Sequence, residues 1–188
     1  VIFFDSGSGA SNSLTLLGVK TSDLSVDGAV IRAASYSSVL AAELADGESV
    51  GTITEVSDAS YAIATVTGGS GRAFIVSLDS HSAIEIPLAT ATSLSAMAAD
   101  QSLSGASLDL GTSSDDTTGL GVSSGTNDQL IMGLAGNDRL EAGLGFDVLV
   151  GGDGQDNFVI TQIDDINSND LIFDYTPDDQ ITLPSSFV

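Results

Sequence analysis

The chain has 188 residues, with 26 acidic and four basic side chains and a formal net charge of −22. This charge argues against nucleic acid or an anionic membrane surface as a partner, because both repel a strongly acidic protein. There is no cysteine, which excludes a disulfide framework and thiolate metal sites and leaves hard, oxygen-ligated cations such as Ca²⁺ as partners for the carboxylates. Hydrophobic residues make up 42% of the chain, enough for a packed core.

The first 32 residues predict a small β-rich segment, in which short β-prone runs alternate with clusters of Ser, Gly, Asn and Asp. We expect strands at 1–4, 14–19 and 29–32, with turns at 5–9 and 25–28. The apolar runs are short, so we expect neither a transmembrane helix nor an N-terminal secretory signal. Because the first residue is valine, we expect a processed chain or a piece of a longer one.

Residues 33–114 predict a second β-rich module. The alternating segments 61–67 and 72–78 are joined by a glycine-rich turn and are expected to form a β-hairpin. The apolar series within 33–44 is compatible with one face of a helix, although serine and β-branched neighbours oppose it. Residues 89–103 are alanine-rich, which favours a helix, but their Thr/Ser alternation favours a strand.

The composition becomes more acidic from Asp109 onward. The polar stretch 111–119 is bounded by glycines and predicts a linker or a long loop, with a boundary near residue 115. Beyond it, four segments align on their aspartates: 123–131, 133–141, 142–150 and 151–159. The aligned aspartates are Asp128, Asp138, Asp147 and Asp156, spaced by 10, 9 and 9 residues.

The residue types of this repeat have a physical explanation. An apolar side chain follows each aspartate by two residues, so a short strand can place one side chain in a core. Glycines at 136, 145 and 154 permit the positive φ that tight turns between such strands require. Aspartates stacked on one another repel, at a cost on the order of 1 kcal/mol per close pair. A divalent ion removes this repulsion, and carboxylate and carbonyl oxygens suit Ca²⁺ better than Mg²⁺.

The repeat resembles the nonapeptide of RTX proteins, G-G-x-G-x-D-x-U-x with U a large apolar residue, which forms a parallel β-roll. The fourth copy, 151–159, matches every fixed position, whereas the first has Ser123, Ser124 and Thr126 in place of glycines and is followed by an additional residue, Met132. The first turn is therefore expected to bind calcium weakly or to act as an N-terminal cap.

The resemblance implies that each coil of the roll contains two repeats, so that Asp128 pairs with Asp147 and Asp138 with Asp156. It also implies backbone-carbonyl ligands at repeat positions one and three. These are Gly133, Ala135, Ala142, Leu144, Gly151 and Asp153. The segment 169–183 resembles the strand pair that ends many RTX proteins, which implies that Asp170 and Asp174 complete the last calcium site and that the protein leaves the cell by type I secretion.

No set of residues predicts catalysis. Residues 121–125 match the G-x-S-x-G pattern, but a hydrolase would need a later histidine, and the single histidine, His81, precedes the pattern. Tyr36, Tyr61 and Phe74 are candidates for a sugar-binding face, although aromatic residues spaced among strands more often belong to a core. We therefore expect a protein that is not an enzyme.

The predicted fold is mainly all-β. It combines a C-terminal parallel β-roll with calcium-binding turns and an N-terminal β-rich, sandwich-like module with one or two short helices. The expected segments are 1–32 (β-rich), 33–114 (β-rich module), 115–160 (calcium-binding β-roll) and 161–188 (capping strands).

The expected function is that of a calcium-binding extracellular bacterial protein with a structural or adhesive role in a surface layer, fibre or adhesin. It would fold on calcium after secretion and would associate with itself or with other cell-surface components, without nucleic acid and without membrane insertion. Two alternatives remain open. The chain could be the non-catalytic C-terminal module of a larger secreted protease, lipase or polysaccharide-active enzyme, or residues 33–108 could be a carbohydrate-binding module with an exposed aromatic platform.

Overall fold

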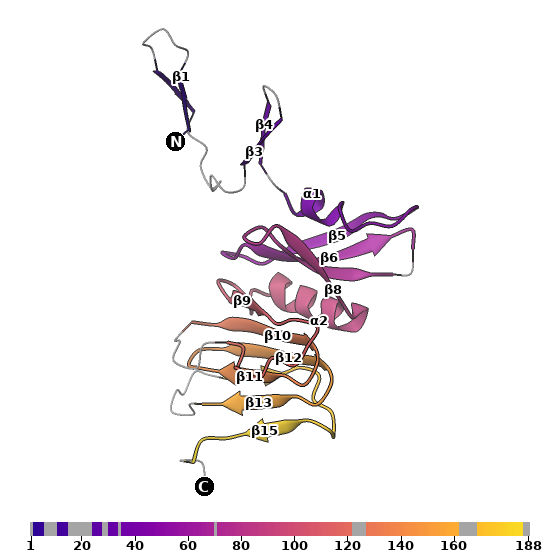
Figure 1. Ribbon diagram of the computed structural model, residues 1–188, viewed down its shortest axis with the longest axis vertical. Coiled ribbons are helices and arrows are strands. Elements are labelled where there is room, and N and C mark those ends of the chain that lie inside the picture. Colours follow the sequence, from indigo (N-terminus) through magenta and orange to yellow (C-terminus); the bar gives the residue numbers. More distant parts are fainter. Residues whose placement is uncertain are drawn as a thin grey trace.

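The structure, a computed structural model, describes residues 35–69, 71–121, 127–161 and 169–185, together with the backbone of four strands before residue 34. In this part of the chain the protein is mainly β, as predicted, and contains two helices (Figure 1). None of the described helices is long and apolar enough to cross a membrane.

The four N-terminal strands form two antiparallel pairs. β1 (Ile2–Asp5) pairs with β2 (Ser11–Leu14), and β3 (Leu24–Asp27) pairs with β4 (Val30–Ala33). The strands predicted at 1–4 and 29–32 are confirmed within about one residue. The turn predicted at 25–28 is wrong, because β3 continues to Asp27, which pairs with Val30. Most of the strand predicted at 14–19, and most of the turn at 5–9, lie outside the described residues.

Residues 35–106 contain one antiparallel sheet with a helix on each face. The sheet has the order β5 (Ser49–Glu55), β6 (Tyr61–Thr67), β7 (Ala73–Ser77), β8 (Ser82–Ile86), and the helices are α1 (Tyr36–Leu40) and α2 (Leu88–Ala99). The predicted hairpin is confirmed by the antiparallel pairing of β6 with β7, and both ambiguous segments contain a helix. The expected sandwich-like pair of sheets is wrong, since helices cover the two faces of a single sheet (Figure 1).

The two faces of β6 and β7 pack into different hydrophobic clusters, because successive side chains of a strand point to opposite faces. Tyr61 and Ile63 pack with the buried face of α2, which includes Leu94. Ala64 and Phe74 pack with Leu40 of α1 on the other face. Burial on both faces accounts for the nearly continuous apolar sequence of these two strands.

The C-terminal half contains two parallel sheets. The first has the order β14 (Leu171–Ile172), β12 (Asp147–Asp153), β10 (Gln129–Ala135), β9 (Ser107–Leu110), and the second has β11 (Arg139–Ala142), β13 (Asn157–Ile160), β15 (Gln180–Thr182). From β10 to β15 the chain alternates between the two sheets, and every pair of neighbours is parallel. We call this arrangement the parallel stack; Figure 1 shows its strands lying one below another beneath α2.

The apolar residues of the repeat form the interior of the parallel stack. Ile131, Leu140, Leu149 and Phe158 are fully buried in one cluster between the two sheets. The opposite face of β10 and β12, which includes Leu130, joins the cluster beneath α2. The turns between these strands contain Gly136, Gly145 and Gly154, whose φ angles of 118°, 110° and 143° confirm that these positions require glycine.

The stack begins earlier in the chain than the repeat alone indicates. β9 pairs in parallel with β10, and Leu120 forms an isolated parallel bridge with Leu140. The segment 111–119, predicted as a linker or long loop, lies against the stack, where the Gly111 N–H donates to the Met132 carbonyl at 2.8 Å. The first repeat therefore does not form the N-terminal end of the stack.

Candidate functional site

Four aspartates line up along one edge of the parallel stack. The backbone N–H of Asp116 donates to Oδ1 of Asp138 at 2.8 Å, that of Asp138 to Oδ1 of Asp156 at 2.9 Å, and that of Asp156 to Oδ1 of Asp179 at 2.9 Å. We call Asp116, Asp138, Asp156 and Asp179 the first column. The predicted pairing of Asp138 with Asp156 is confirmed as a direct bond, and the carboxylates of Asp138, Asp156 and Asp179 each accept from the backbone of the preceding residue in the column.

A second column lies where the chain enters β10, β12 and β14. The backbone N–H of Gln129 donates to Oδ1 of Asp147 at 3.0 Å, and that of Asp147 donates to Oδ1 of Asp170 at 3.2 Å. We call Gln129, Asp147 and Asp170 the second column. Asp147 is fully buried, and its Oδ2 accepts a further hydrogen bond from the Gly143 N–H at 2.9 Å.

The predicted pairing of Asp128 with Asp147 is wrong by one residue. The register places Gln129 opposite Asp147, and Oδ1 of Asp128 instead accepts from the Phe146 N–H at 2.8 Å. With Gln129 in the first position, the repeat has a constant spacing of nine residues and Met132 is not an insertion. The shift occurs because β10 pairs with β12 so that Ile131 and Leu149 lie side by side in the core.

Glycine makes room for the carboxylates of the first column. A Cβ atom on Gly133 would collide with Oδ2 of Asp138, and a Cβ atom on Gly151 would collide with Oδ2 of Asp156. Each glycine precedes its aspartate by five residues in the sequence. The carboxylates therefore lie directly against the backbone of the preceding strand, where a side chain would exclude them.

The second position of the repeat also has a special backbone. Gly152 has a φ of 98°, and Leu134, which pairs with it in register, has a φ of 79°. This conformation favours glycine and is strained for leucine. At this position the second repeat therefore has the same left-handed backbone conformation as the fourth, although it has a leucine where the fourth has a glycine.

The two columns bring carboxylates close together at buried positions, where little water surrounds them. Burial raises the pKa of Asp147 to about 6, and the charges of Asp170 and Asp128 add to this effect. Burial also raises the pKa of Asp138 and Asp156, each with a contribution from the next carboxylate in the first column. Each shift has the same cause: the carboxylates lack enough water or positive charge around them.

The described residues provide no side-chain cation for the columns. Arg72 pairs with Glu48 and Glu85, and Arg139 pairs with Glu141. In the part of the chain that the structure describes, Oδ2 of Asp138 is buried and has no hydrogen-bond partner. A buried carboxylate oxygen without a hydrogen-bond partner destabilises the folded protein. A cation bound next to Oδ2 of Asp138 would remove this cost.

The last predicted carboxylates are Asp170, which belongs to the second column, and Asp174, which lies against the backbone of β12. Oδ1 and Oδ2 of Asp174 accept from the Gly151 and Gly152 N–H groups, both at 2.8 Å, and burial raises the pKa of Asp174. Burial raises the pKa of Asp170 as well. The side chains of Asp170 and Asp174 therefore accept hydrogen bonds from the backbone of β12, at its first residue and near its end.

The predicted carbonyl ligands lie along the strands and turns next to the columns. Gly133 and Ala135 are in β10, Ala142 ends β11, Leu144 follows it in a turn, and Gly151 and Asp153 are in β12. The Ala142 carbonyl accepts hydrogen bonds from Thr161, and the Asp153 carbonyl accepts one from the Gly136 N–H at 2.9 Å. Among the described residues, no group of three or more acidic, His or Cys side chains is arranged to hold a metal ion. A cation at these turns would therefore need backbone oxygens as well as carboxylates.

Three members of the columns were missed by the sequence analysis. Asp179 is followed two residues later by Ile181, the same pattern as in the repeats, so this signal was available. Gln129 lacks the carboxylate on which the segments were aligned. Asp116 has threonines after it instead of an apolar residue. Only the backbone pairing identifies these last two.

The structure also bears on the other candidates. Tyr61 and Phe74 are 2% and 1% exposed, so the preferred interpretation of these two residues as part of a core is confirmed, and they form no exposed aromatic platform. His81 lies in an exposed turn with a φ of 53°. Of the G-x-S-x-G segment only Gly121 is described.

Comparisons with known proteins give no family for this chain. No family model matches it, and neither the curated proteins nor the solved structures contain a match.

Proposed function

We propose that this chain is a calcium-binding structural module of an extracellular bacterial protein. In this proposal the parallel stack is a β-roll of the RTX type, and Ca²⁺ ions bind at its turns along the two columns. The module would serve in a surface layer, a fibre or an adhesin.

The topology supports the β-roll. Strands alternate between two parallel sheets, and the register joins residues 18 positions apart, as in Asp138 and Asp156. Eighteen residues are two nonapeptides, which is the length of one coil that the resemblance implies.

The single observation that carries the proposal is the buried, unpartnered Oδ2 of Asp138, seated against Gly133. The donors around the columns are carboxylate and carbonyl oxygens, and they fit a calcium ion, which takes six to eight oxygen ligands in flexible geometry. Asp138, Asp147, Asp156 and Asp170 would hold the ions, together with carbonyls from the predicted set.

A bound ion would supply positive charge to the columns, and this links calcium to folding. A chain of net charge −22 with raised carboxylate pKa values loses stability through repulsion between its own charges. Calcium binds only where the coils bring the carboxylates together, so its binding free energy contributes to folding. We propose that the chain stays unfolded in a cytoplasm poor in calcium, is exported by type I secretion, and folds outside the cell.

The test is far-UV circular dichroism with light scattering, first in EGTA and then as calcium is added to millimolar concentration. We expect a cooperative gain of β signal. The double variant Asp138→Asn/Asp156→Asn should need more calcium, whereas the control Asp46→Asn, at an exposed loop residue, should not. An unchanged spectrum, or an equal response to magnesium, would reject the calcium-folded roll. Scattering that rises with calcium would support assembly into a layer or fibre.

A further inference from the structure

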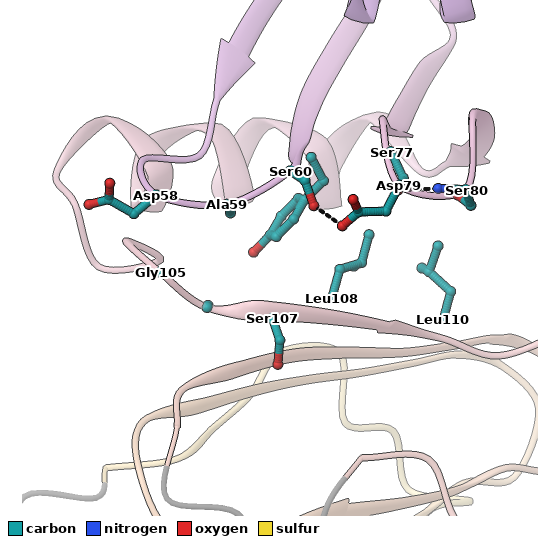
Figure 2. Close-up of a pocket in the computed structure, with 12 residues that line it drawn as sticks. Asp58, Ala59, Ser60, Ser77, Asp79, Ser80, Gly105, Ser107, Leu108 and Leu110 are labelled. Carbon is teal, nitrogen blue, oxygen red and sulfur yellow. Dashed lines mark hydrogen bonds between the residues drawn. The ribbon is translucent and has the colours of Figure 1, made fainter. Parts of the chain in front are cut away.

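A cavity of about 620 Å³ lies between the antiparallel sheet and the first strand of the parallel stack. It is bounded by the turn before β6, the turn after β7, and the segment that leads into β9 (Figure 2). Figure 2 shows Leu108 and Leu110 pointing from β9 toward Asp79 and Ser80. The volume of the cavity falls in the range of small-molecule sites, roughly 300–1,000 Å³.

The walls of this cavity combine hydroxyls, carboxylates and a small apolar surface. The Ser60 hydroxyl donates a hydrogen bond to Oδ2 of Asp79, which fixes that carboxylate at the cavity (Figure 2). Ser77 and Ser80 lie on the same side, and Leu108 and Leu110 form the apolar side opposite. No Lys, Arg or His is among the described residues that line the cavity.

Tyr61 also lines the cavity, and its hydroxyl is unsatisfied. The residue is 2% exposed, and its hydroxyl has no hydrogen-bond partner within the described part of the molecule. Burial raises the pKa of this phenol, so the group keeps its proton and remains a donor. A buried donor without an acceptor is unfavourable, and a ligand that offers an acceptor would remove this cost.

We propose that this cavity binds a small saccharide, whose hydroxyls accept from Tyr61 and donate to Asp79 while one face of the sugar ring rests on Leu108 and Leu110. The site is separate from the two columns, so it gives the module a binding activity in addition to the proposed calcium function.

The lining selects this chemistry over two other classes of ligand. An anion is disfavoured, because the Asp79 carboxylate lies at the cavity and none of the described lining residues is basic. An ammonium group can pair with Asp79, but it offers no acceptor to the Tyr61 hydroxyl. A sugar hydroxyl both donates and accepts hydrogen bonds, and the C–H face of a sugar ring can pack on apolar side chains. Of these three classes of ligand, only a saccharide matches the Tyr61 hydroxyl, the Asp79 carboxylate and the two leucines.

The experiment uses the full chain in saturating calcium, with circular dichroism to verify the fold of each sample. Saturation-transfer NMR is recorded with glucose, galactose, mannose, N-acetylglucosamine and maltose, and with ethanolamine and acetate as amine and anion probes. We expect at least one sugar to bind and neither of the other probes to do so. Binding of ethanolamine or acetate alone, or of no sugar in the panel, would overturn the proposal.

Variants then assign the binding to the cavity. Tyr61→Phe removes only the hydroxyl, so we expect about three- to tenfold weaker sugar binding, with thermal stability in the absence of sugar unchanged or raised. Asp79→Asn should also weaken binding. The matched control is Tyr175→Phe, which removes a hydroxyl from a half-exposed tyrosine near the last strand of the stack and should bind sugar normally. Normal sugar binding by Tyr61→Phe would show that the hydroxyl does not contact the sugar, and a clear loss of thermal stability would show that it serves the fold. Either result would overturn the proposal.

The two proposals can fail separately. A calcium-dependent gain of structure without sugar binding removes only the saccharide site. Sugar binding by a chain whose spectrum does not respond to calcium removes only the calcium function, because the cavity is lined by residues outside the columns.

Discussion

The backbone N–H of Asp138 donates to Oδ1 of Asp156, 18 residues later in the chain, at 2.9 Å. The same bond recurs between Gln129 and Asp147 on the other edge of the parallel stack. In each case an acidic side chain of one coil is tied to the backbone of its neighbour. The aspartates of the repeat therefore hold the coils together at the turns, in addition to any ion that they bind.

The first prediction concerns Gly151, which leaves room for the Asp156 carboxylate. Gly151→Ala should destabilise the folded protein by about 1–3 kcal/mol, because the added Cβ atom forces the buried carboxylate or the backbone to move. Urea denaturation in calcium measures this loss. Gly69→Ala is the control, since its Cβ atom would meet only the side chain of Glu48 and should cost much less. Equal losses would contradict the role of Gly151.

The second prediction separates Asp147 from Asp128. Asp147 is a fully buried member of the second column, whereas Asp128 lies one residue away from the column position. Asp147→Asn should raise the calcium concentration needed for folding much more than Asp128→Asn does. A calcium titration followed by circular dichroism measures both midpoints. The opposite order would show that the pairing of Asp128 with Asp147, and not the observed register, describes the calcium-bound protein.

The third prediction restores an aspartate to the position of Gln129. Gln129→Asp places a carboxylate directly opposite Asp147. We expect tighter calcium binding, because the column gains a hard oxygen ligand, and less residual β signal in EGTA, because the two carboxylates then repel each other. A calcium titration and far-UV circular dichroism in EGTA measure the two effects. Gln129→Asn keeps the amide and should show neither of them.

The fourth prediction is a pH dependence of the calcium-free protein. Burial raises the pKa of Asp147 from an ordinary value of 3.8 to about 6, so the folded state binds this proton more tightly than the unfolded state. The resulting stability is fully present below pH 3.8 and is lost as the pH rises to about 6 and beyond. Far-UV circular dichroism in EGTA should therefore show more β structure near pH 5 than near pH 7, because protonation of Asp147 favours the folded state.

The control for this pH dependence is Asp147→Asn, which removes the titrating group and should weaken the trend. The remaining trend comes from Asp138, Asp156, Asp170 and Asp174, whose pKa values are also raised by burial. A β signal of the wild-type protein in EGTA that falls steadily with acid would contradict the prediction.

Local sequence was sufficient for several parts of the fold. The hairpin of β6 and β7 was predicted because two alternating apolar segments flank a glycine-rich turn, and this signal needs no distant partner. The buried positions Leu140 and Phe158 were likewise predicted from their constant distance after an aspartate. Residues 89–103 were ambiguous, since alanine and threonine favour different structures, and packing of Leu94 against the sheet selects the helix.

The sequence by itself determined the nine-residue spacing of Asp138, Asp147 and Asp156, the glycines of the repeat and its buried apolar residues, because each depends on residues close together in the chain. Only the tertiary structure decided which residues stand in the columns. Gln129 replaces Asp128 because the pairing of β10 with β12 places Ile131 beside Leu149, and Asp116 joins the first column through a bond to a residue 22 positions away. The cavity that contains Tyr61 also forms only where β9 lies against the antiparallel sheet. These features depend on contacts between distant segments, whose register is set by packing in the core and not by local residue preference.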